Sequence, residues 1–140
     1  MRRLNFILPK YGWRVSVFMP VESVDVSAIM ESLSGAGISY TNLRDAYDCI
    51  MKEEFNCGFT YSNPSERRSV MVVGVASNAS ELYDTLQHEQ THLAMNIAEE
   101  FEIDVGSEEF AYLVGDISRL IFPYAEPFLC DNCRRRAMAR

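Results

Sequence analysis

The sequence predicts an α+β domain in which a small sheet supports one long helix and a shorter helix that follows it. The run from Ser69 to Ala76 is β-branched and almost wholly apolar, which is typical of a buried strand. Directly after it, residues 78–81 (Asn-Ala-Ser-Glu) have the form of a capping box that opens a helix reaching about Phe101. A second helix is expected from Glu108 to about Ile121, and it should stop at Pro123.

The first half of the chain has weaker signals. Val15 to Met19 reads as a strand that ends at Pro20. Short helices are expected from Val26 to Leu33 and from Asn42 to Phe55, and the segment from Phe59 to Pro64 resembles a turn. We therefore expect two of the helices to precede the main strand.

Composition is that of an ordinary globular protein. The 140 residues, 48% hydrophobic and 24% charged, suit a single domain over 1–140, with an irregular tail from about residue 124. A net charge of −7 argues against general nucleic-acid binding, which needs clustered Lys and Arg. Because no apolar run suits an export signal or a membrane span, we expect a cytoplasmic protein that does not bind membranes.

Four cysteines offer one alternative metal site. Cys130 and Cys133 have the spacing of half a zinc knuckle. Seven residues lie between Cys49 and Cys57, which is an unusual spacing for the other half of such a site. Reduced, unligated thiols are therefore the preferred interpretation.

Both histidines of the chain lie in one segment, His88-Glu89-Gln90-Thr91-His92. On a helix this spacing puts the two imidazoles on one face, where they can hold one metal ion. Glu89 is displaced around the helix and can reach a metal-bound water without becoming a ligand. This arrangement indicates one zinc ion per chain, with Glu89 as the catalytic base.

The phase of this helix supports the metal interpretation. Its predicted apolar stripe consists of Leu82, Leu86, Leu93, Ile97 and Phe101, and both histidines fall on nearly the opposite side. They are thus not expected to fill the core. Solvated surface histidines are the alternative.

A third ligand is expected from the last helix, because catalytic zinc usually takes three protein ligands. Glu108, Ala111 and Gly115 share a face of small residues, which would let that helix approach the histidines and bring Glu108 to the ion. Glu109 is the second choice. Both glutamates are also explained by the helix dipole, which favours acidic residues in the first turn.

His88, Glu89, His92 and the downstream Glu108 together resemble the glutamate branch of the zincin metallopeptidases. The segment from Glu108 to Gly115 is similar to small bacterial and phage-associated members, in which a Glu-x-x-Ala sequence supplies the third ligand. The resemblance covers about residues 69–121 and implies a minimal zincin-like layout, with an active-site helix and a ligand-bearing helix. It implies a zinc-dependent peptidase that acts on a protein or peptide.

The chain departs from this family in two respects. The glycine and third histidine that mark metzincins are missing, and Tyr112 stands where thermolysin-like enzymes have an Asp that orients a zinc histidine. Asp116 is the alternative orienting residue. Tyr112 and Tyr83 are the candidates for stabilising the oxyanion.

Two further expectations complete the interpretation. The strand over residues 70–76 is expected to be the edge that aligns an extended substrate. The alternative function is a non-catalytic, zinc-stabilised regulatory or protein-binding domain of a mobile element.

Overall fold

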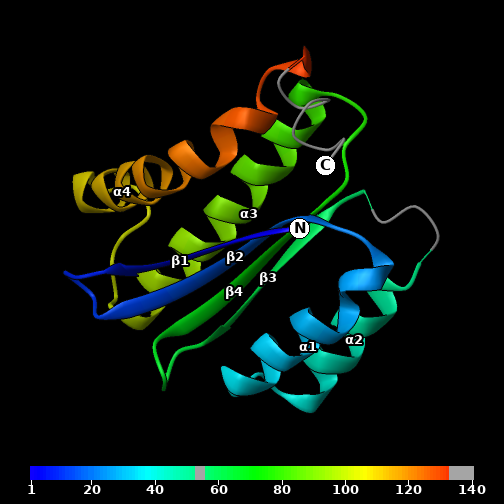
Figure 1. Ribbon diagram of the computed structural model, residues 1–140. Helices are drawn as coiled ribbons and strands as arrows, with labels where there is room; N and C mark the ends of the chain where they lie inside the picture. Colours follow the sequence, from blue (N-terminus) through cyan, green and yellow to red (C-terminus); the bar gives the residue numbers. More distant parts are fainter. Residues whose placement is uncertain (53–55, 133–140) are drawn as a thin grey trace.

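The computed structural model describes residues 1–52 and 56–132 and has helices on both sides of one sheet (Figure 1). The elements follow one another as β1 (Arg2–Leu8), β2 (Trp13–Val21), η1 (Ser23–Asp25), α1 (Val26–Gly35), α2 (Tyr40–Ile50), β3 (Gly58–Asn63), β4 (Arg68–Gly74), α3 (Ala79–Glu100), α4 (Glu108–Ala125) and η2 (Glu126–Phe128).

The sheet has four strands in the order β1-β2-β4-β3. Antiparallel pairs join β1 to β2 and β3 to β4, whereas β2 and β4 run parallel, joined by a crossover that contains α1, α2 and β3. Helices α3 and α4 lie on one face, and α1 and α2 on the other (Figure 1). The predicted α+β class is confirmed.

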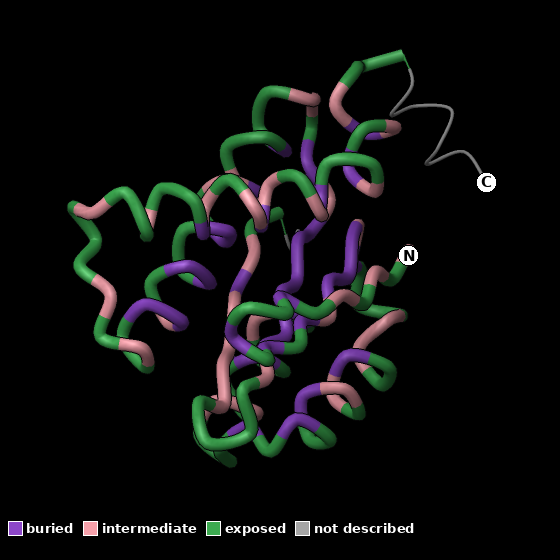
Figure 2. Tube along the Cα trace, turned by 90° about the vertical axis from the view of Figure 1, so that its left-hand side faces the viewer, coloured by how far each residue is buried: buried purple, intermediate pink, exposed green. Residues whose placement is uncertain are grey.

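Successive side chains of a strand point to opposite faces of the sheet, so apolar residues form two cores, one on each side. Trp13, Val15 and Val17 of β2 are buried under α3 and α4, while Phe18 and the β4 residue Val72 are buried under α1 and α2. Figure 2 shows the buried positions on the sides of the helices that face the sheet. Each helix is therefore held by the apolar side that faces a strand.

The long helix α3 matches its predicted start. Asn78 is the N-cap, and its side chain accepts a hydrogen bond from the Glu81 backbone N–H at 2.9 Å. The Glu81 carboxylate accepts a hydrogen bond from the Ser77 backbone N–H at 3.1 Å. Of the predicted stripe, Leu82, Leu86, Leu93 and Ile97 are buried and Phe101 is half-buried, packed against the core.

The order of the strands corrects two expectations. The segment from Phe59 to Asn63 belongs to the strand β3, and the turn follows it at Pro64 to Arg67. β4 lies between β2 and β3, so it is an interior strand and cannot add a substrate strand. The edge beside α3 is β3. β1, the other edge, was also not anticipated from the sequence.

Helix ends differ from the sequence prediction at two places. α2 ends at Ile50, and residues 53–55 of the predicted helix lie outside the described residues. α4 continues through Pro123 to Ala125, where burial of Ile121 and Ala125 offsets the backbone hydrogen bond that Pro123 cannot donate. The tail from residue 124 is thus helical as far as Phe128.

None of the helices in residues 1–52 and 56–132 combines the length and apolar character needed to cross a membrane.

Packing of α3 against the sheet predicts a sharp contrast between two apolar residues. Leu93 is fully buried, whereas Met95 is 47% exposed. Leu93→Ala should lower the free energy of unfolding by about 2–5 kcal/mol, because it leaves a cavity in the core. Met95→Ala, the control, should change it by less than about 0.5 kcal/mol. Urea denaturation followed by circular dichroism measures both, and equal losses would contradict the position of α3.

Candidate metal centre

Helix α3 presents the two histidines side by side on its exposed face. The Nε2 atoms of His88 and His92 lie 3.1 Å apart, and the ring centroids are 4.8 Å apart. Two nitrogens bound to one tetrahedral zinc ion at 2.0–2.1 Å would be about 3.3 Å apart. The pair therefore has nearly the separation that a shared zinc requires, although the same distance fits a hydrogen bond between two neutral rings.

The Glu89 side chain extends toward β3 and stays close to His88. Only 4% of the residue is exposed, and its Oε1 accepts a hydrogen bond from Thr60 Oγ1 at 2.9 Å. The same Thr60 hydroxyl lies 3.3 Å from the Glu89 carbonyl oxygen. Oε2, the other carboxylate oxygen, lies 4.0 Å from His88 Nε2. Thr60 thus holds one oxygen of Glu89 and leaves the second beside the histidine pair.

Close approach of β3 to α3 depends on Gly58. A Cβ atom at this position would lie 2.6 Å from the Val72 carbonyl oxygen and 3.0 Å from Glu89 Cγ. Real Cβ atoms do not make contacts as short as the first of these. Glycine at this position therefore lets the strand pass close enough for Thr60 to reach Glu89.

Two further side chains share the electrostatic environment of Glu89. Burial raises the pKa of the Cys57 thiol, and the charges of Cys49 and Glu89 add to this rise. Burial also raises the pKa of Tyr61, with smaller contributions from Asp45, Cys49 and Glu89. Both groups are consequently held in their neutral forms at neutral pH.

Glu108, the expected third ligand, is not brought to the histidines. It lies in the first turn of α4 on the same side as Ala111 and Gly115, and all three are exposed. The face of small residues therefore points to solvent instead of approaching α3. Among residues 1–52 and 56–132, no three His, Cys, Asp or Glu side chains are grouped so that they could hold a metal ion.

Helix geometry explains this separation. Gln90 faces α4, where its Nε2 donates a hydrogen bond to Ser118 Oγ at 2.9 Å. At about 100° per residue, His88 and His92 each lie about 160° around α3 from Gln90. The histidines thus lie on the side of α3 that faces away from α4. The second choice, Glu109, forms an exposed ion pair with Lys10 at 3.3 Å.

The other residues suggested for this centre also lie elsewhere. Asp116, the expected orienting group, forms an ion pair with Arg119 at 3.1 Å. Tyr112 is 71% exposed on α4, and Tyr83 lines a hollow between α3 and α4. Cys49 and Cys57 are free thiols, and Cys133 lies outside the described residues.

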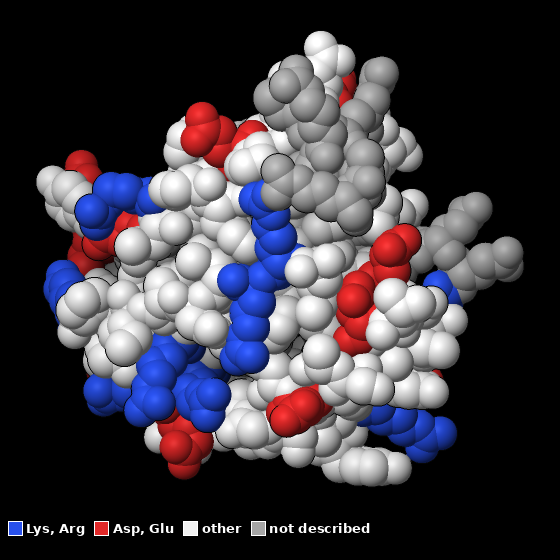
Figure 3. Space-filling view, in the orientation of Figure 1, with Lys and Arg blue, Asp and Glu red and all other residues white. Residues whose placement is uncertain are grey.

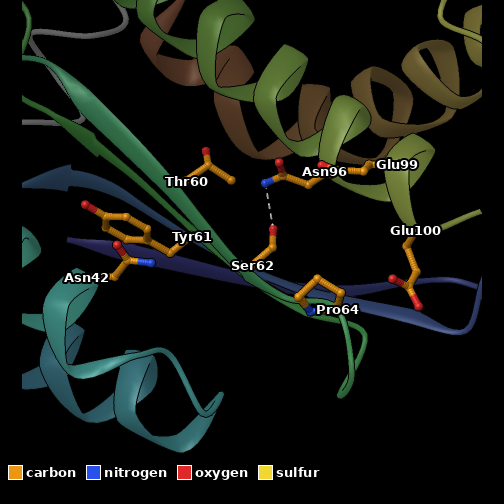
Figure 4. Close-up of a pocket in the computed structure, with 8 residues that line it drawn as sticks. All are labelled: Asn42, Thr60, Tyr61, Ser62, Pro64, Asn96, Glu99 and Glu100. Carbon is orange, nitrogen blue, oxygen red and sulfur yellow. Dashed lines mark hydrogen bonds between the residues drawn. The ribbon is translucent and has the colours of Figure 1, made fainter.

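A polar groove lies between α3 and β3 (Figure 4). Asn96 Nδ2 donates to Ser62 Oγ at 2.8 Å across it. The groove has a volume of about 370 Å³ and is lined by Asn42, Thr60, Tyr61, Ser62, Pro64, Asn96, Glu99 and Glu100. Asn96 follows His92 by four residues, so the two share a face of the helix, and this spacing could have identified Asn96 from the sequence. The sequence pattern does not identify Thr60 and Ser62, because the segment from Phe59 to Pro64 resembles a turn.

Comparison of this chain with family models, curated proteins and solved structures found no match.

The tight packing at Gly58 predicts opposite effects for two glycine substitutions. Gly58→Ala should lower the free energy of unfolding by about 1–3 kcal/mol, because β3 must move away from Val72 and Glu89. Gly115→Ala, the control, should raise it by about 0.5–1 kcal/mol, since a Cβ there meets nothing within 4 Å. Thermal or urea unfolding measures both. A destabilising Gly115→Ala would show that α4 uses its small face for packing.

Proposed function

We propose that this chain binds one zinc ion through His88 and His92 and hydrolyses peptide bonds with Glu89 as the general base. The observation that supports this most directly is the convergence of the two Nε2 atoms at 3.1 Å, with the free Oε2 of Glu89 on the same side. Two imidazole nitrogens and an adjacent carboxylate are the groups that a zinc hydrolase uses.

Glu89 has the geometry of a proton acceptor. Zinc, when bound, would lower the pKa of its water to about 7 and polarise a carbonyl group. Thr60 donates to Oε1, so Oε2 is the oxygen available to take a proton and later return it to a leaving amine. Because Glu89 is nearly buried, its carboxylate keeps one orientation while it does so.

A peptide is the substrate class that the neighbouring strand favours. Among the residues that the structure describes, β3 is the last strand of the sheet and pairs with β4 alone, so its outer edge is the place where a peptide would add a strand. The polar groove runs along the same strand and contains hydroxyl, amide and carboxylate groups. We therefore assign to β3 the role in substrate alignment that the sequence had suggested for β4.

A non-catalytic zinc-binding regulatory domain is the second candidate. It is favoured by the lack of a third protein ligand among the described residues, since catalytic zinc usually has three. In that case the remaining zinc positions would be filled by a group from a partner protein. Zinc binding without hydrolysis distinguishes this function from the first.

Zinc binding should depend on the histidines and not on α4. Wild-type protein should bind one zinc per chain, and His88→Ala or His92→Ala should weaken binding by at least about tenfold. Glu108→Ala should match its neighbour control Glu109→Ala and the wild type, because both glutamates are exposed on α4. Isothermal titration calorimetry with zinc chloride measures these affinities.

Two outcomes would contradict this assignment. Full zinc occupancy in a His88→Ala, His92→Ala double variant would move the metal to the cysteines. A large loss of affinity in Glu108→Ala alone would mean that α4 rearranges to bring this residue to the ion.

Hydrolysis should depend on Glu89. Glu89→Gln keeps the size of the side chain and both histidines, but removes the group that accepts the proton. Cleavage in a broad peptide library, measured by mass spectrometry, should fall at least about a hundredfold, while zinc binding persists. Glu31→Gln, an exposed position on α1, is the matched control and should keep full activity. Equal cleavage by Glu89→Gln and the wild type would refute the mechanism. No cleavage by either protein, with zinc bound, would favour the regulatory domain.

A further inference from the structure

One part of the sheet is left uncovered by the helices. On the face that carries α1 and α2, these helices pack against Phe18, Val70 and Val72. Toward β1, the same face carries Arg3, Asn5, Ile7, Arg14 and Ser16, of which Ser16 is half-buried and the others are exposed. Ile7, an apolar residue, is 54% exposed. This open half of the sheet faces away from α3 and α4.

Three arginines surround a hollow of about 380 Å³ on this surface. Arg3 comes from β1, Arg14 from β2 and Arg68 from β4, with Asn5 and Ser16 between them. We call this set of five residues the basic hollow. Arg14 and Arg68 are direct neighbours in the register. Figure 3 shows basic side chains gathered on this side of the molecule, where Figure 1 places the sheet.

Two of the arginines are already held in place. Arg3 Nε donates to Asn5 Oδ1 at 3.2 Å, and its guanidinium carbon lies 5.1 Å from the centre of the Phe18 ring. Arg68 Nη1 donates to the Gly35 carbonyl oxygen at 2.9 Å. Neither contact uses all the N–H groups of a guanidinium, which has five. Less conformational entropy is therefore lost when the remaining groups bind an anion.

The charges of these arginines are not neutralised by the parts of the chain that the structure describes. Among the described residues, the ion pairs of Lys and Arg within 4.0 Å join Lys10 to Glu109 and Arg119 to Asp116, and neither involves an arginine of the basic hollow. Glu31 lines a neighbouring hollow with Arg3 and Arg68, yet no ion pair joins them. A cluster of positive charge thus persists in a chain whose net charge is −7.

We propose that the basic hollow docks an extended acidic segment of a partner protein, with Asp or Glu at alternating positions. Guanidinium groups bind carboxylates in pairs of parallel hydrogen bonds. Arg14 of β2 lies opposite Ile7 of β1, and Ile7 is four residues along β1 from Arg3. Arg3 and Arg14 are therefore about 13 Å apart along the strands. Carboxylates at positions i, i+2 and i+4 of an extended segment span this distance on one side.

An acidic protein segment fits this surface better than nucleic acid. A nucleic-acid duplex carries one negative charge per about 1.7 Å of its axis. The phosphates that extend beyond the three arginines would be repelled by this chain, whose net charge is −7. A short acidic segment needs only local positive charge. The inference is independent of the proposed zinc chemistry because the two surfaces lie on opposite faces of the sheet.

Peptide binding tests the basic hollow. A fluorescein-labelled peptide of alternating Glu and Ser should bind the wild-type chain at low salt, as measured by fluorescence anisotropy, and should bind more weakly as salt is added. The double variant Arg3→Glu, Arg14→Glu should bind about tenfold more weakly or worse, since two charge-assisted contacts are lost. Arg3→Gln, Arg14→Gln should show an intermediate loss, and circular dichroism should confirm that both variants are folded.

Arg44→Glu is the matched control, because Arg44 is exposed on α2 and does not line the hollow. It should bind the peptide as the wild type does. The proposal is overturned if the wild type does not bind the peptide, or if a folded double variant binds it equally well. It is also overturned if single-stranded DNA of the same length and label binds more tightly than the peptide, which would assign the hollow to nucleic acid.

Discussion

Glu89 is buried where helix α3 crosses the edge strand β3, and the positions of the other site residues follow from this contact. Gly58 allows the close approach, Thr60 holds the carboxylate, and Ser62 bonds to Asn96 further along the helix. These three strand residues alternate, so all of them face α3. The rotation of α3 that places Glu89 against β3 also turns His88 and His92 to solvent at the margin of the same strand.

A carboxylate at this buried position costs stability, because its charge leaves water and Thr60 is its one side-chain hydrogen-bond donor among the described residues. Leucine or methionine there would pack against β3 without that cost. Local violations of the rules for a stable core are typical of functional sites. The buried charge beside two converging histidines therefore supports a chemical role better than a purely structural one.

The uneven covering of the sheet separates the two surfaces for which we propose functions. Helices α3 and α4 cover one face completely enough to bury Trp13, Val15 and Val17, and the site lies at the β3 margin of that face. On the opposite face, α1 and α2 pack over the β4 side and leave the β1 side open. That open side holds the basic hollow, so an acidic partner would bind there without blocking β3.

The sequence alone was sufficient for the local features: the strand before α3, the Asn78 cap, and a helix phase that put His88 and His92 opposite its apolar stripe. These depend on periodicity and on neighbouring residues, which a sequence displays directly. The tertiary structure was needed to show that β4 is interior, that β3 is the edge, and that Glu108 is not grouped with the histidines. Each depends on which surfaces pack together. On α4, small residues at Ala111 and Gly115 are compatible with either close packing or exposure to solvent, so they did not decide which side of the helix faces α3.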